Sequence, residues 1–237
     1  MAKYIGFLSG KGGVGKTTTA VNIGASLAKQ KEDVVLVDAD FSAPSVCLHL
    51  GRDFHPFTIH DVMSGNSAVS STIYDGPHGL KFIPGDKTIL GRHLVDSDLF
   101  KSKLVDLHVH CDYVLIDFSS GLAENVESLT EVLDEAIIVT DQSIPSVIHA
   151  KRLKDFLVAK GVDIRGVVVN KYSPRSHRLS LDAIKNHLNL LVLGIIPEDK
   201  RFLFALKDAK AFVEMYPRKK VSAIFSDVAQ KVSGVAL

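Results

Sequence analysis

Four glycines and two lysines lie within eight consecutive residues near the start of the chain. Residues 10–17, GKGGVGKT, fit the pattern G-x-x-x-x-G-K-[ST]. Glycines at this spacing let successive backbone N–H groups turn inward around phosphate oxygens, where a Cβ would crowd the loop. A lysine placed like Lys16 can reach the β- and γ-phosphates, and the Thr17 hydroxyl can ligate Mg²⁺. The segment therefore predicts a site for the phosphates of a nucleotide, with contacts from Gly10, Gly12, Gly13, Val14, Gly15, Lys16, Thr17 and Thr18.

Aspartates stand at the ends of two apolar runs. Asp38 and Asp40 follow the run at 34–37, and Asp117 follows the run at 113–116. An aspartate at the end of a buried strand near a phosphate loop can hold Mg²⁺ through water or orient an attacking water molecule. The placement of Asp117 is typical of the magnesium-binding aspartate of phosphate-loop enzymes. The three aspartates are therefore candidates for these two tasks.

The elements that position these residues are predicted by the alternation of short apolar runs with longer amphipathic stretches. The runs are continuously apolar, which is typical of parallel strands covered on both faces. They lie at 4–8, 34–37, 80–83, 113–116, 136–139, 166–169 and 190–196, and helical patterns lie at 17–30, 147–160 and 181–188. This order predicts an α/β fold, a doubly wound and mostly parallel sheet flanked by helices. We expect residues 1–237 to form a single domain.

Composition excludes several classes of protein. The net charge of +1 gives no overall bias toward nucleic acid or membrane. Cys47 and Cys111 form no CxxC pair, which argues against a disulfide framework or a cysteine-bound metal centre and favours a reducing cytoplasm. The first residues indicate a strand rather than a signal peptide, and no uncharged apolar run approaches the roughly 20 residues of a membrane span. We therefore expect a cytoplasmic protein.

The second lysine of the loop points to a particular family. The sequence KGGVGKT resembles the deviant Walker A loop of the MinD/ParA family of P-loop ATPases (SIMIBI type), particularly its archaeal MinD-like members. In that family the early lysine reaches across a dimer interface to the phosphates of the partner's ATP. The resemblance implies that Lys11 acts in the partner's site and that Lys16 binds phosphate in its own subunit. Both lysines are therefore candidate catalytic residues.

The resemblance also assigns roles elsewhere along the chain. It implies that Asp40 positions the hydrolytic water, and that Thr17, Asp38 and Asp117 serve Mg²⁺. It further implies that the Gly121 N–H senses the γ-phosphate. For recognition of the adenine base of ATP, the candidate is Asn170, whose side-chain amide can pair with the N6/N1 edge of adenine. Pro197 and Asp199 resemble the family's second base-flanking loop.

This chain also departs from the family pattern. Ser119 stands where family members commonly carry a proline, Ser45 stands where an asparagine is common, and residues 141–143 read DQS in place of the usual Asn-Pro-Glu. The apolar stripe of the last helical pattern, Val221 to Val232, is typical of a core-packing helix. That interpretation argues against an autonomous membrane anchor.

The function implied by the resemblance is an Mg-ATP-dependent dimerisation switch that hydrolyses ATP and acts as a spatial regulator of cell division or cargo positioning. Its expected partners are a second copy and an activating or cargo protein, with the inner membrane face reached through a partner. A partition ATPase that binds non-specific DNA is one alternative, because basic residues gather near Lys200 and residues 217–220. A cysteine-less relative of Mrp-type carrier ATPases, a metabolic P-loop ligase or kinase, and a non-hydrolysing nucleotide-binding module are the others.

Overall fold

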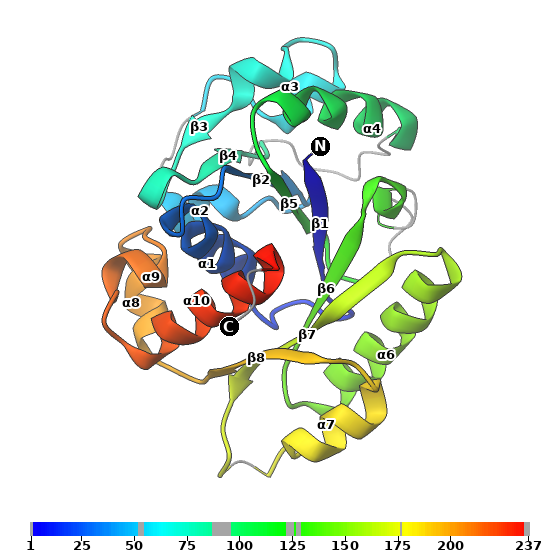
Figure 1. The fold of residues 1–237 in the computed structure, drawn as a ribbon, viewed down its shortest axis with the longest axis vertical. Helices are drawn as coiled ribbons and strands as arrows, with labels where there is room; N and C mark the ends of the chain where they lie inside the picture. Colours follow the sequence, from blue (N-terminus) through cyan, green and yellow to red (C-terminus); the bar gives the residue numbers. More distant parts are fainter. Residues whose placement is uncertain are drawn as a thin grey trace.

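One sheet organises the molecule. The computed structural model describes residues 2–51, 55–86, 96–121, 126, 129–175 and 177–234 of the chain. The strand order is β3-β4-β2-β5-β1-β6-β7-β8, and every neighbouring pair is parallel except β3 with β4. The strands are β1 (Lys3–Leu8), β2 (Val34–Ala39), β3 (Tyr74–Asp75), β4 (Lys81–Ile83), β5 (Tyr113–Phe118), β6 (Glu135–Thr140), β7 (Asp163–Tyr172) and β8 (Val192–Pro197). The predicted fold class is confirmed (Figure 1).

Helices cover both faces of this sheet. One face carries α1 (Lys16–Lys29), α9 (Phe212–Met215) and α10 (Lys220–Ser233), and α1 packs against α10. The other face carries α3 (Ile59–Met63), α4 (Ser97–Val105), α6 (Ile144–Ala159) and α7 (Leu181–Leu188). Shorter helices α2 (Val46–Leu50) and α8 (Arg201–Lys207) contact each other. Short 3₁₀ helices lie at Val69–Thr72, Pro77–Gly79, Asp106–Val109 and Thr130–Val132.

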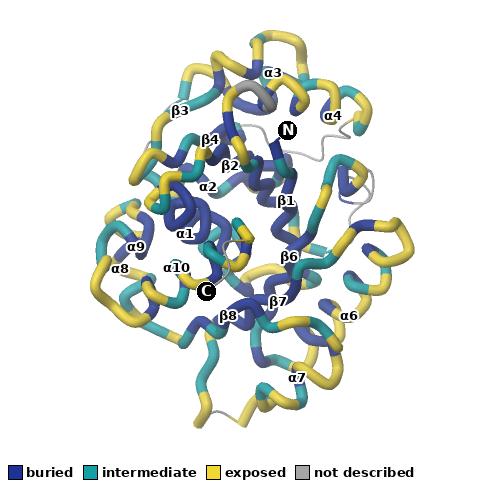
Figure 2. Tube along the Cα trace, viewed as in Figure 1, coloured by how far each residue is buried: buried dark blue, intermediate teal, exposed yellow. Residues whose placement is uncertain are grey.

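Successive side chains of the central strands point alternately into two apolar cores, one on each face of the sheet. In β1, Ile5 and Phe7 point into the core shared with α1 and α10, whereas Tyr4 and Leu8 point into the core on the other face. Strands β1, β2, β5 and β6 are accordingly buried along nearly their whole length, while the outer surfaces of the helices are exposed (Figure 2). Burial on both faces explains why the strands read as continuous apolar runs.

Element boundaries follow the sequence to within a few residues, and several short elements were not predicted. Helix α7 spans the predicted residues, and α6 begins three residues before the predicted start, since Pro145 is well tolerated in a first helical turn. The strand β3 was not predicted, because two residues carry no periodicity. The apolar stripe of α10 is buried from Val221 to Val232, so the core-packing interpretation is confirmed. Within the described residues, no helix has both the length and the apolar character needed to cross a membrane.

Candidate functional site

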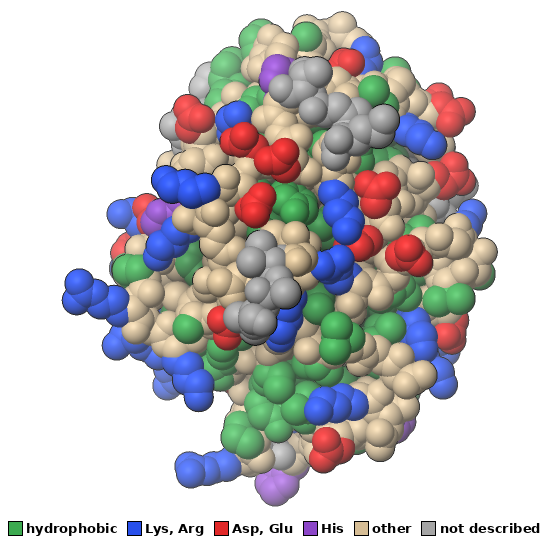
Figure 3. Space-filling model, in the orientation of Figure 1, with side chains coloured by type: hydrophobic (Ala, Val, Ile, Leu, Met, Phe, Trp, Pro, Cys, Tyr) green, Lys and Arg blue, Asp and Glu red, His purple; other side chains and the backbone are tan. Residues whose placement is uncertain are grey.

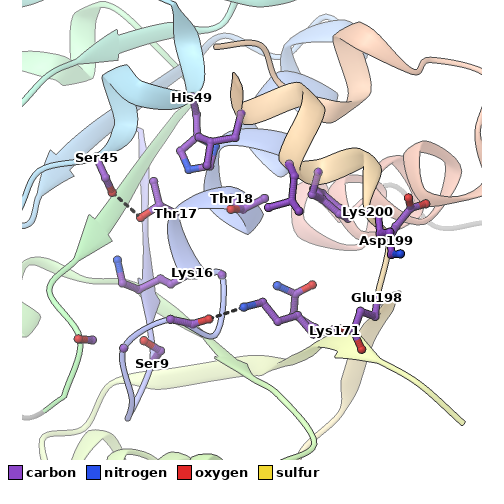
Figure 4. A pocket seen from close by; sticks show the side chains of 18 of the residues that line it. Ser9, Lys16, Thr17, Thr18, Ser45, His49, Lys171, Glu198, Asp199 and Lys200 are labelled. Atoms are coloured by element: carbon purple, nitrogen blue, oxygen red, sulfur yellow. Dashed lines mark hydrogen bonds between the residues drawn. The ribbon is translucent and has the colours of Figure 1, made fainter. Parts of the chain in front are cut away.

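A cavity of about 570 Å³ lies where the loop between β1 and α1 meets the carboxyl ends of the parallel strands. Its walls come from that loop, from α1 and α2, from the ends of β7 and β8, and from α8 (Figure 4). The crevice outside the carboxyl ends of the strands is where ligands bind in open α/β sheets. Of the sequence-predicted residues, the cavity walls include Gly12, Gly13, Gly15, Lys16, Thr17, Thr18, Asp40, Asn170, Pro197 and Asp199.

The loop between β1 and α1 needs glycine for two different reasons. At Gly10, an added Cβ would lie 2.4 Å from the backbone of His149 in α6, so the loop packs too closely on that helix for a side chain. Gly15 has a φ of 90° and caps α1 without any side-chain hydrogen bond. The first N–H groups of α1 therefore remain available, and a helix N-terminus of this kind attracts anions. This geometry fits a phosphate group.

A buried cluster joins the loop to the end of β5. Lys16 Nζ donates to Asp117 Oδ1 at 2.6 Å, and Thr17 Oγ1 donates to Asp117 Oδ2 at 2.6 Å. Asp117 is completely buried and Lys16 is 7% exposed. Burial raises the pKa of Asp117, and the ammonium group of Lys16 opposes that shift. In this arrangement Lys16 neutralises Asp117, a role that a bound cation near Thr17 could take over.

A second buried carboxylate lies beside the first. Asp38 and Asp117 are direct neighbours in the register of β2 and β5. Asp38 accepts backbone N–H groups from Val46 at 2.9 Å and from Ser45 at 2.8 Å. Burial, followed by the charge of Asp117, raises the pKa of Asp38 to about 7. Two buried carboxylates thus share one lysine, an arrangement that a divalent cation would stabilise.

The available donors suit Mg²⁺. They are the carboxylates of Asp38 and Asp117 and the hydroxyl of Thr17, with the Ser45 hydroxyl 3.1 Å from Thr17 Oγ1. All are oxygens, as Mg²⁺ prefers. The described residues include no group of three or more His, Cys, Asp or Glu side chains placed to hold a metal. Mg²⁺ is usually bound through one or two carboxylates together with water and substrate phosphates.

Asp40 is held by hydrogen bonds on one of its two carboxylate oxygens. Its Oδ1 accepts from Ser119 Oγ at 2.8 Å, from the Ala43 N–H at 3.0 Å and from the Ser42 N–H at 3.3 Å. The sequence singled out Ser119 as a departure from the family pattern, but gave no sign of this hydrogen bond. The side chain of Asp40 lines the cavity.

The end of β7 is tied directly to the phosphate loop. Asn170 Nδ2 donates to the Val14 carbonyl oxygen at 2.8 Å, and Lys171 Nζ donates to the Gly13 carbonyl oxygen at 2.6 Å. Lys171 adopts a φ of 52°, which is uncommon for a residue with a side chain. Lys171 was not predicted from the sequence. The bond to Val14 uses one of the two Nδ2 hydrogens, so the second N–H and the Oδ1 of Asn170 remain for recognition of a base.

Two further residues shape the cavity. His49 of α2, which the sequence analysis also missed, points toward Thr17 and Thr18, and burial lowers its pKa to about 4 (Figure 4). A lone histidine in an otherwise apolar helix carries no motif that could have revealed it. On the rim, the Asp199 carboxylate accepts from Arg201 Nε at 2.9 and 3.0 Å, and this partner lowers its pKa. The base-flanking role of Pro197 and Asp199 stays a prediction.

Some predicted residues are not among the described residues that line the cavity: Gly10, Lys11, Val14, Asp38, Asp117 and Gly121. Lys11 is exposed and is not among the described residues that line it. The Gly121 N–H donates to the Ser9 carbonyl oxygen at 2.8 Å, so the predicted contact of this N–H with a γ-phosphate would require that bond to open. The roles of Lys11 and Gly121 therefore stay predictions.

Known proteins resemble this chain over almost its whole length. A protein of Methanocaldococcus jannaschii described as an uncharacterized ATP-binding protein is 30% identical over 99% of this chain and 89% of its own length. The cell division ATPase MinD of Pyrococcus furiosus has a TM-score of 0.89 and 26% identity, with complete coverage of both chains. The septum site-determining protein MinD of Pyrococcus horikoshii, in complex with Mg-ADP, has a TM-score of 0.88 at 26% identity, covering 98% of this chain and 96% of its own.

The domain profile of one family matches most of the sequence. The profile is that of the CobQ/CobB/MinD/ParA nucleotide binding domain, and it matches residues 5–212. That span includes the phosphate loop, the three aspartates and Asn170. The chain belongs to the CobQ/CobB/MinD/ParA nucleotide-binding domain family, within its MinD/ParA group of ATPases.

Proposed function

We propose that this protein is an Mg-ATP-dependent dimerisation switch, in which two copies close face to face around two ATP molecules and separate after hydrolysis. The observation that supports it most is the different placement of the two loop lysines. Lys16 lines the cavity and is buried, whereas Lys11 is exposed and does not line it. A lysine with no use in its own cavity is free to complete the cavity of a second copy.

In the proposed reaction this chain supplies position and charge. The glycine loop and the N-terminus of α1 bind the phosphates, and Lys16 moves from Asp117 to the β- and γ-phosphates. Mg²⁺, held by Thr17 and through water by Asp117 and Asp38, would neutralise charge that develops on the phosphate oxygens. Asp40 orients the attacking water. Such catalysis rests on positioning and electrostatic stabilisation, with little covalent chemistry asked of the protein.

The proposed biological role is spatial regulation of cell division or of a cargo. The similarity to proteins named as cell division ATPases and septum site-determining proteins supports this role. We further propose that it works in the cytoplasm as a single domain, that an activating or cargo protein binds the closed dimer, and that such a partner brings it to the inner membrane face.

A second candidate is a partition ATPase that binds non-specific DNA. A groove of about 440 Å³ between the end of α1 and the start of α10 is lined by four cationic side chains, Lys29, Arg218, Lys219 and Lys220. No acidic side chain is among the described residues that line it. Figure 3 shows Lys and Arg side chains gathered along the edge where α8 and α9 lie. DNA binding that weakens steeply with added salt would favour this candidate.

The test combines phosphate release with sizing of the protein in ATP, in ADP and without nucleotide. We expect dimers only with Mg-ATP and phosphate release from the wild-type protein. Lys16→Ala should lose nucleotide binding, whereas Lys11→Ala should bind ATP as a monomer without forming dimers. A protein that binds ATP tightly but releases no phosphate would contradict the proposed switch, as would phosphate transfer to a metabolite instead of water.

A further inference from the structure

We infer that Ser119 is a positioning residue that holds Asp40 in place to orient the attacking water. The inference rests on the proposed ATPase function and goes beyond it. Its basis is the hydrogen bond of 2.8 Å from Ser119 Oγ to Asp40 Oδ1. A side chain without a hydroxyl or amide donor could not form this bond.

The fold brings the two residues together across neighbouring strands. In the parallel register of β2 and β5, Asp38 faces Asp117 and Ala39 faces Phe118. The next residue on each strand is Asp40 and Ser119, so the hydrogen bond continues the same register beyond the sheet. Seventy-nine positions separate the two residues along the chain.

Among the described residues, Ser119 is the one donor to the Asp40 carboxylate that lies outside the loop that follows β2. The other donors to Oδ1 are the backbone N–H groups of Ser42 and Ala43, which belong to that loop and move with it. They set the local turn but cannot fix its position relative to the phosphate site. The Ser119 hydroxyl therefore anchors the loop to the end of β5.

The same segment of chain that holds Asp40 also contacts the phosphate loop. Asp117, two residues before Ser119, accepts from both Lys16 and Thr17. The segment 117–119 thus carries the side chain that contacts the phosphate loop and the side chain that holds Asp40. A change in the contacts of Asp117 on ATP binding would reach Asp40 through a segment of three residues.

The hydrogen bonds leave the other oxygen of Asp40 available. Within the described part of the chain, no group donates to Asp40 Oδ2, and Asp40 lines the cavity. Three donors on Oδ1 fix the carboxylate plane, so Oδ2 can accept a hydrogen bond from water in one orientation. Small displacements of a catalytic group are costly, which gives an anchoring hydrogen bond kinetic importance.

Steady-state ATP hydrolysis by Ser119→Ala, Ser119→Thr and Asp40→Ala tests the inference. Ser119→Ala should lower kcat roughly tenfold, equivalent to about 1.4 kcal/mol. Its KM for ATP should stay within about twofold, since loss of a group that acts after binding lowers kcat, and Ser119 is not among the cavity-lining residues. Ser119→Thr retains a hydroxyl and should retain kcat. Ser67→Ala is the matched control, because the one acceptor of the Ser67 hydroxyl within the described residues is the neighbouring Ala68 carbonyl oxygen.

The double variant separates positioning from a general structural role. If Ser119 acts through Asp40, then Asp40→Ala combined with Ser119→Ala should hydrolyse ATP no more slowly than Asp40→Ala alone. A further loss in the double variant, or a wild-type kcat in Ser119→Ala, would overturn the inference. So would failure of Ser119→Thr to retain activity.

The same variants keep this inference distinct from the proposed function. A slow Asp40→Ala with a normal Ser119→Ala would remove only the role of Ser119. A fully active Asp40→Ala would remove Asp40 from the mechanism, and the role of Ser119 with it. Absence of hydrolysis in the wild-type protein would overturn the proposed ATPase function itself.

Discussion

Replacing Lys16 by alanine should lower the thermal stability of the nucleotide-free protein, in addition to preventing nucleotide binding. Lys16 Nζ lies 2.6 Å from Asp117 Oδ1, and both side chains are buried. Asp38, also fully buried, lies beside Asp117 in the strand register. Lys16→Ala therefore leaves two buried carboxylates without the lysine that they share.

The size of the effect follows from this geometry. At 2.6 Å and an effective dielectric constant of about 20, the attraction between the two charges is about 6 kcal/mol. Part of that is offset by the cost of burying the ions, and removal of one partner of a buried pair typically costs about 3–5 kcal/mol. For a chain of this length, about 2–4 °C are lost per kcal/mol. The melting temperature should thus fall by roughly 6–20 °C.

Thermal unfolding of the nucleotide-free protein at two pH values measures this loss. Without Lys16 the pKa of Asp117 should rise further, because the cation that opposes the effect of burial is gone. Protonation of Asp117 relieves the unpaired charge, so the loss should be smaller at acid pH and larger at pH 8. Adding Asp117→Asn to Lys16→Ala should restore part of the stability but not nucleotide binding.

The matched control is Lys11→Ala, the same change at an exposed lysine that forms no ion pair with any described residue. Its melting temperature should stay close to that of the wild-type protein. If Lys16→Ala has the same melting temperature as the wild-type protein at pH 8, the reasoning is refuted, because Lys16 would then contribute nothing to the stability of the nucleotide-free fold.

Two further predictions concern the cavity walls. Gly15→Ala should weaken ATP binding at least tenfold by equilibrium titration, because its Cβ would lie 2.2 Å from Asn170 Nδ2 at a φ of 90°. Gly65 has a φ of 74° with open space around it, so Gly65→Ala should bind ATP normally. Equal ATP affinities of Gly15→Ala and Gly65→Ala would contradict the steric argument. The pKa of His49 is lowered to about 4 by burial, so its stabilising contribution is present above its ordinary pKa and is lost as pH falls toward 4. Urea unfolding from pH 7 to pH 4 should therefore show a steeper loss of stability in the wild type than in His49→Gln, and parallel curves would contradict this.

Local patterns in the sequence predicted much of the fold and the phosphate loop. The loop is a contiguous motif, and the strands are continuous apolar runs because both faces of the sheet are covered. Asp38 and Asp117 could be expected near the loop, since the carboxyl ends of parallel strands share one edge. None of these inferences required the strand order.

The contacts that were missed all depend on that order. Ser119 reaches Asp40 only because β2 and β5 are neighbours, and Lys171 reaches Gly13 across 158 positions of chain. Such pairings leave no periodic signal in a single sequence. The hydrogen bond between Lys16 and Asp117 is likewise visible only in the folded structure.

The most direct test of the central claim, that Lys11 completes the site of a second copy, is complementation between two impaired variants. Lys11→Ala retains Asp40, and Asp40→Ala retains Lys11. If Lys11 acts across the interface, a mixed dimer contains one complete site, and mixing the two proteins should produce faster ATP hydrolysis than either protein shows alone. Activity of the mixture that equals the average of the two separate proteins would contradict the claim.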